Sequence, residues 1–153
     1  MEGNFQICYQ VFEKEQLLIQ KFSGLFSFEI YSKYTSFLMQ NSNLKNVSKV
    51  LIDFRELTIG NKLKEIKQEI KRIAELRKNI HQKEINRDAI IQLFIVDKPI
   101  PTAIAKIFIN YFPHMDYRIC STTHSVISHL ELELDETELE VMINSLKNEF
   151  VLQ

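Results

Sequence analysis

Two short apolar runs constrain the fold of this chain more than any other feature. Residues 50–54 read Val-Leu-Ile-Asp-Phe, and residues 89–96 form the most hydrophobic run in the sequence. Neither run alternates apolar with polar residues, as a strand with one solvent-exposed face does. Short, almost wholly apolar strands are typical of a parallel sheet that helices cover on both faces. We therefore expect both runs to be interior strands of such a sheet.

The rest of the chain supplies the other elements. Apolar residues at helical spacing predict helices near residues 27–38, 62–84, 101–112, 121–130 and 135–150. Alternation and short apolar runs predict strands near residues 5–12, 17–22, 50–54, 89–96 and 117–120. Ser27 is the expected N-cap of the first helix, because its side chain can accept a hydrogen bond from a free backbone N–H.

This order of elements (strand, strand, helix and then three strand–helix units) predicts an α/β fold. We expect a mostly parallel five-stranded sheet whose first strand is an antiparallel edge. The length of 153 residues suits one domain, and no linker or repeat interrupts the chain. We therefore assign residues 1–153 to a single domain, in which residues 132–153 form a C-terminal helical extension.

Composition argues against several classes of protein. The formal net charge of -1 predicts no general attraction to nucleic acid or to anionic membranes. No apolar run approaches the roughly 20 residues that span a bilayer. The first residues lack the basic and apolar regions of a signal peptide, and the two cysteines are too few for a disulfide framework. A cytoplasmic protein with reduced thiols and no membrane span is expected.

The polar residues best suited to a ligand site follow the predicted strands. They are Asp53 and Arg55, Asp97 and Lys98, and Ser121 and Thr122. Ligands bind open parallel sheets at the carboxyl ends of the strands, so we expect a polar rim there, at which helix N-termini offer N–H donors to an anion. The same residue types also end strands and cap helices without binding anything, and this interpretation stays open.

No motif in the sequence identifies a catalytic or metal centre. Two helical metal ligands should be four positions apart, whereas His124 and His129 are five apart. There is no Gly-x-Ser-x-Gly elbow and no Gly-rich phosphate loop. We expect no metal, no cofactor and no enzymatic activity. An enzyme that uses Asp53 or Asp97 as an acid or base is the less favoured alternative.

Charge is distributed unevenly along the chain. Residues 62–87 carry nine basic residues against four acidic ones, and residues 131–149 carry seven acidic residues against one basic one. One interpretation is that the acidic C-terminal helix docks near the basic helix, within one chain or across a dimer. The other is that both are solvated helix faces whose exposed ion pairs contribute little stability.

Several stretches of the chain resemble a known family. They are Leu17 to Gly24 running into a helix, residues 49–55, Ile95-Val96-Asp97 with the helix that follows, and residues 117–122 with the next helix. Together, over residues 5–131, they resemble the SpoIIAA-like or STAS domain family, in particular its branch of STAS/SEC14-like bacterial proteins. The resemblance implies a non-catalytic regulatory or protein-interaction module.

The best-understood members of that family are anti-sigma-factor antagonists, which are switched by phosphorylation of a serine after the third strand. Their motif there is roughly Asp-Ser-Ser-Gly. The corresponding residues 57–63 of this chain contain neither serine, and Asn61 and Lys62 occupy the turn. The resemblance therefore does not extend to this switch.

The sequence thus favours a regulatory or interaction module that forms a homodimer or binds another protein. The main alternative is a binder of a small apolar or lipid-like ligand. The SEC14-like resemblance and the apolar helix at residues 102–112 favour that alternative, although helical periodicity also explains the helix as ordinary core.

Overall fold

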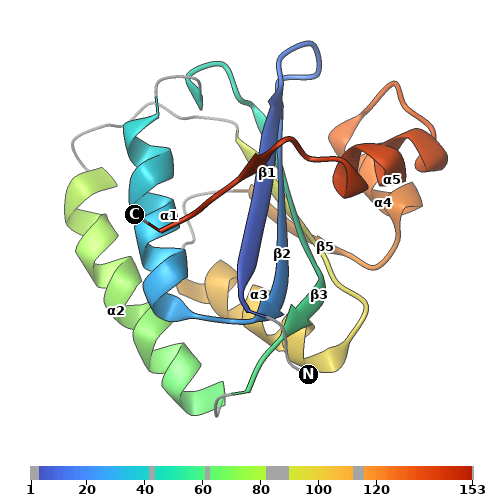
Figure 1. Ribbon diagram of the computed structural model, residues 1–153. Helices are drawn as coiled ribbons and strands as arrows, with labels where there is room; N and C mark the ends of the chain where they lie inside the picture. The colour runs from blue at the N-terminus through green and yellow to red at the C-terminus, as the bar shows by residue number, and fades with distance from the viewer. Residues whose placement is uncertain (1–3, 42–43, 61–62, 82–89, 112–115, 153) are drawn as a thin grey trace.

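The structure, a computed structural model, describes residues 4–152 except 42–43, 61–62, 82–89 and 112–115 (Figure 1). Its strands are β1 (Gln6–Phe12), β2 (Leu17–Leu25), β3 (Lys49–Thr58), β4 (Ile91–Ile95), β5 (Asp116–Cys120) and β6 (Asn148–Glu149). Its helices are α1 (Phe28–Gln40), α2 (Leu63–His81), α3 (Pro99–Tyr111), α4 (Thr123–Leu130) and α5 (Glu136–Asn144). Among these helices, none has the length and apolar character needed to cross a membrane.

One mostly parallel sheet organises the chain, in the order β5-β4-β3-β2-β1-β6. Strands β2 to β5 are parallel, and β1 is antiparallel to β2. The two apolar runs pair directly, with Leu51 opposite Leu93 and Ile52 opposite Phe94. The prediction that they are adjacent, buried, parallel strands is confirmed.

The sheet is covered on both faces by helices (Figure 1). From β2 to β5, each new strand is added next to the previous one, always in the same direction across the sheet. Right-handed crossovers therefore place α1, α2 and α3 on one face of the sheet. Their buried residues Tyr34, Ile70 and Ile104 share one core with Phe22 and Phe54. We call this side of the sheet the aromatic face.

The C-terminal segment covers the opposite face. Helices α4 and α5 bury Val126, Leu139 and Ile143 in a second core, against Leu51 and Ile95 of the sheet. We call this side the aliphatic face. The extension at residues 132–153 is therefore not an appendage, because its helix α5 covers this face together with α4.

The predicted helix at 135–150 is wrong beyond Asn144. There the chain leaves α5, forms the two-residue strand β6 beside β1, and makes the sheet six-stranded instead of five-stranded. Phe150 then reaches the aromatic face, where its ring lies 5.3 Å from Tyr34 and 5.4 Å from Phe37. Its helical spacing in the sequence was a coincidence, because its burial comes from crossing the sheet edge.

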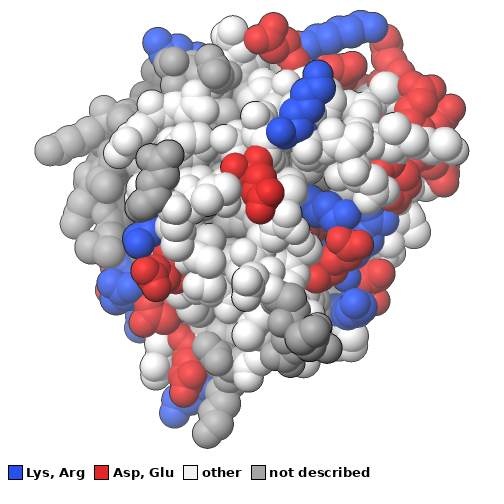
Figure 2. Space-filling view, viewed as in Figure 1, with Lys and Arg blue, Asp and Glu red and all other residues white. Residues whose placement is uncertain are grey.

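The interpretation that α5 docks on α2 within one chain is also wrong. The two helices lie on opposite faces of the sheet (Figure 1), and acidic side chains gather over α5 and its flanking residues, far from α2 (Figure 2). Instead, α5 contacts basic residues of the sheet: Glu140 pairs with Arg55 at 2.6 Å, and Asn144 accepts a hydrogen bond from Lys21 at 3.0 Å. Docking across a dimer remains a prediction.

Two smaller predictions, the Ser27 cap and the hairpin, are confirmed. Ser27 caps α1, accepting a hydrogen bond from the Ile30 N–H. Residues 13–16 join β1 to β2 in a hairpin, as predicted. Strand β2 continues through Ser23 and Gly24 to Leu25, past its predicted end, because a register shift after Lys21 and the positive φ of 79° at Gly24 bend the strand without ending it.

Candidate functional site

The predicted polar rim does form at one edge of the sheet, but its members divide into two groups. Asp53 and Arg55 belong to a network of ion pairs, whereas Asp97, Lys98 and Ser121 line an open groove. Thr122 belongs to neither group, since its hydroxyl caps α4 by accepting a hydrogen bond from the Ser125 N–H at 3.2 Å.

The ion-pair network ties the end of β3 to α5. Asp53 is only 1% exposed, and both of its carboxylate oxygens accept hydrogen bonds from the Arg55 guanidinium at 3.0 Å. The same guanidinium donates to both oxygens of Glu140, and the Lys98 ammonium donates to the Arg55 carbonyl at 3.2 Å. Bidentate pairing of this kind fixes the side chains in one geometry.

The protonation of Arg55 follows from these contacts. Partial burial alone lowers the pKa of Arg55, but the hydrogen bonds and charges of Asp53 and Glu140 outweigh burial, so the pKa is raised above its ordinary value. The guanidinium therefore stays charged and paired. The Asp53 carboxylate has no free oxygen with which to act as a base, which argues against its proposed catalytic use.

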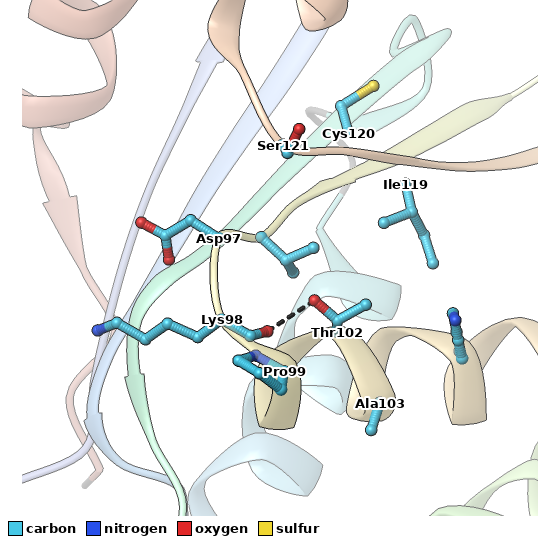
Figure 3. A pocket seen from close by; sticks show the side chains of 10 residues that line it. Asp97, Lys98, Pro99, Thr102, Ala103, Ile119, Cys120 and Ser121 are labelled. Atoms are coloured by element: carbon cyan, nitrogen blue, oxygen red, sulfur yellow. Dashed lines mark hydrogen bonds between the residues drawn. The ribbon is translucent and has the colours of Figure 1, made fainter.

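The groove lies beside this network, at the carboxyl ends of β4 and β5 and the start of α3 (Figure 3). We call it the carboxyl-edge groove; it has a volume of about 720 Å³ and is open to solvent. Its lining residues are Val96, Asp97, Lys98, Pro99, Thr102, Ala103, Lys106, Ile119, Cys120 and Ser121.

The polar side chains of the groove do not converge on one point. In Figure 3, Asp97 and Lys98 point away from Ile119, and the Ser121 hydroxyl points away from Thr102. The Thr102 hydroxyl is itself engaged, because it donates to the Lys98 carbonyl at 2.6 Å. The interior of the groove is left to apolar groups, with charges at its margin.

The start of α3 is poorly suited to anion binding, contrary to our expectation for the rim. Helix N-termini bind anions through free N–H groups, and proline has none. Among the first three residues of α3, Pro99 and Pro101 lack this donor and only Ile100 has one. The next N–H, from Thr102, already donates to the Lys98 carbonyl at 3.1 Å.

Nucleophilic chemistry in the groove is also disfavoured. Burial raises the pKa of the Cys120 thiol, and the positive charge of Arg118 opposes this only in part. The thiol therefore stays protonated near neutral pH, and a protonated thiol is a poor nucleophile. Among the described residues, no group of three or more His, Cys, Asp or Glu is placed to hold a metal ion.

Sequence reasoning missed Thr102, Lys106 and Ile119 in the groove and Glu140 in the network. Thr102 and Lys106 are four residues apart, so a helix starting at Pro99 would have put both on one face. No comparable signal connects Glu140 to Arg55, which is 85 positions away in the chain. The apolar helix at 102–112, which favoured a lipid-like ligand, instead buries Ile104, Ala105 and Ile107 in the aromatic face as ordinary core.

Comparison with known proteins adds no assignment to this site. No protein-family model matches the chain, and no curated protein matches it either.

Proposed function

We propose that this chain is a non-catalytic regulatory module of STAS-like type that binds another protein at the carboxyl-edge groove. The observation that carries the proposal is the composition of the groove. Val96, Ile119 and Ala103 give it an apolar interior, and the exposed Asp97, Lys98 and Lys106 surround that interior. Protein interfaces combine an apolar centre with a polar margin in the same way.

The charge and position of the groove indicate the kind of partner. Two lysines and one aspartate leave its margin positive, which favours an acidic segment. Strand β5 is the outermost strand on this side of the sheet, and an extended segment can pair with an edge strand. We therefore propose an extended protein segment with an apolar side chain for the groove and acidic residues beside it.

Two further features support an interaction role over an enzymatic one. Of the two aspartates that an enzyme would use as an acid or base, Asp53 is engaged by Arg55 through both of its carboxylate oxygens. The order of strands and helices over residues 5–131, on which the STAS-like resemblance rests, supports a regulatory module.

Charge reversal at the groove tests the proposal. The variant Lys98→Glu/Lys106→Glu inverts the charge of the groove margin, and Lys14→Glu/Lys45→Glu makes the same change at exposed residues near the opposite edge of the sheet. Proteins captured from lysate by the wild type and both variants are quantified by mass spectrometry. We expect one partner that the groove variant captures at least about tenfold less and the control variant captures normally. Equal capture by all three proteins would contradict the proposal.

A second copy of the chain is one partner that the proposal includes. Size-exclusion chromatography with light scattering measures the mass of the wild type and of both variants at one concentration. A homodimer that uses the groove becomes monomeric in Lys98→Glu/Lys106→Glu and stays dimeric in Lys14→Glu/Lys45→Glu. A dimer that both variants preserve would place the self-contact elsewhere.

A further inference from the structure

A second hollow, partly open to solvent, lies between α1 and strands β2, β3 and β4. Its volume is about 150 Å³, and it is separate from the carboxyl-edge groove, with which it shares no lining residue. Most of its wall is apolar, with Leu18, Leu38, Val50 and Ile52 among the lining residues. A cavity of roughly this size holds a molecule comparable to benzene.

The wall of this hollow contains a polar side chain that ordinary core packing does not explain. Gln20 is 5% exposed and lines the hollow from the middle of β2, between Leu18 and Phe22 on the same face of the strand. Its carboxamide therefore borders the space of the hollow. A ligand group that hydrogen-bonds to this carboxamide inside the hollow would gain a contact that a purely apolar wall does not offer.

A second carboxamide lines the same hollow. Gln92 of β4 faces the same side of the sheet, because it pairs with Val50 while Gln20 pairs with Ile52. Standard strand spacing and rise place the two Cα atoms about 12 Å apart, on either side of β3. Among the lining residues that the structure describes, none is Asp, Glu, Lys, Arg or His.

We propose that this hollow is a binding site for a small uncharged molecule with an apolar body and an amide-like edge. The apolar wall takes the body, and the Gln20 carboxamide, which offers both a donor and an acceptor, pairs with an edge that carries both. An uncharged ligand is favoured because none of the described lining residues would compensate a buried charge. The site is independent of the groove, so either proposal can fail alone.

Benzamide is a suitable probe because it combines a ring with such an edge. Toluene lacks the edge, and benzoate replaces it with a charge. Each is titrated into isotope-labelled full-length protein, and the Gln20 side-chain NH₂ signals and the backbone amides of β2 and α1 are followed by NMR. We expect benzamide to shift these signals and to bind more tightly than toluene, and we expect benzoate to leave them unchanged.

Two variants test the role of Gln20. Gln20→Leu keeps the volume and removes the amide, so we expect benzamide to bind about fivefold to tenfold more weakly, which is the fold-change that one or two neutral hydrogen bonds produce. Toluene should bind this variant at least as well as the wild type. Gln6→Leu, at an exposed position of β1, is the matched control and should bind benzamide normally.

The proposal is overturned if benzamide shifts none of these signals up to its solubility limit, which would mean that the hollow holds only water. It is equally overturned if Gln20→Leu binds benzamide as the wild type does. Should Gln20→Leu fail to fold, Met39→Trp supplies the test, because its indole is expected to fill the hollow from the half-buried Met39 position. Unchanged benzamide binding in Met39→Trp would then contradict the proposal.

Discussion

The two faces of the sheet are packed in different ways. On the aromatic face, rings contact each other in series, with Phe22 lying 5.3 Å from Phe54 and Phe54 lying 5.3 Å from Phe94. On the aliphatic face, the buried core residues that the structure describes are Leu, Ile, Val and Cys120. The 150 Å³ hollow lies on the aromatic face.

Buried polar groups show the same contrast. On the aliphatic side, Asp53 is almost completely buried, and both of its oxygens are paired with Arg55. On the aromatic face, the Tyr34 hydroxyl is buried and finds no hydrogen-bond partner among the described residues, and the Gln20 carboxamide borders the hollow. The Asp53 carboxylate is thus paired and ties β3 to α5 through Arg55, whereas the Tyr34 hydroxyl on the aromatic face is unpaired among the described residues.

The largest expected effect tests whether the aliphatic face is an essential layer. Leu139 of α5 is 0% exposed, so Leu139→Ala leaves a cavity against the sheet and should lower the free energy of unfolding by about 4 kcal/mol. Thermal and urea unfolding measure this change, and for a chain of this length the melting temperature should fall by about 10 °C.

Val141→Ala is the control on the same helix. Val141 is 61% exposed, so this variant should change the free energy of unfolding by less than about 0.5 kcal/mol. If both variants had equally small effects, α5 would be a dispensable appendage and the contrast between the faces would be lost.

The next effect concerns the ion-pair network. Arg55→Ala leaves the Asp53 carboxylate buried without its partner, and removal of one member of a buried pair costs about 3 kcal/mol. Glu140→Ala should cost only about 1 kcal/mol, because Glu140 is 35% exposed and can be replaced by water. Urea unfolding of both variants and of the double variant measures the coupling. If Arg55→Ala and Glu140→Ala lowered the free energy of unfolding equally, the buried Asp53 carboxylate would not need Arg55 as its partner.

The fold was largely predictable from local patterns. The strands at 50–54 and 89–96 need only an apolar run of the right length, and the Ser27 cap needs only its position before a helix. The strand β6 was not predictable in this way. Its two residues are held by pairing with Cys8 and Tyr9 at the other end of the chain, and this contact overrides the helical spacing that extends to Phe150.

The candidate sites were predictable only in part, because side-chain direction and tertiary contact decide what a polar residue does. Asp53 and Arg55 lie two positions apart on one strand, so their pairing on the same face follows from strand geometry. That Glu140 joins them, or that Gln20 borders a hollow, depends on how distant helices pack. A polar residue in an apolar strand was nevertheless a visible signal, and Gln20 carries it.

The smallest expected effect is a gain in stability, from removing an unpaired polar group on the aromatic face. Tyr34 is 0% exposed, and its hydroxyl has no hydrogen-bond partner among the described residues. Tyr34→Phe removes this unpaired group and keeps the ring contacts with Phe22 and Phe150. The free energy of unfolding should rise by about 1 kcal/mol, which urea unfolding near neutral pH measures. A loss of similar size would mean that the hydroxyl is hydrogen-bonded in solution.

Tyr34→Phe should also change how the free energy of unfolding depends on pH above about pH 10. Burial raises the pKa of Tyr34 well above its ordinary value, and the neighbouring Tyr9 and Tyr31 raise it further. In the unfolded chain the hydroxyl ionises near pH 10, so above that pH the unfolded state loses a proton that the folded state keeps. Stability that is fully present below about pH 10 is therefore lost as the pH rises, by up to about 1.4 kcal/mol per pH unit for this one group. Tyr34→Phe should lack this part of the decline, and parallel curves for the two proteins above pH 10 would contradict the burial of an un-ionised Tyr34.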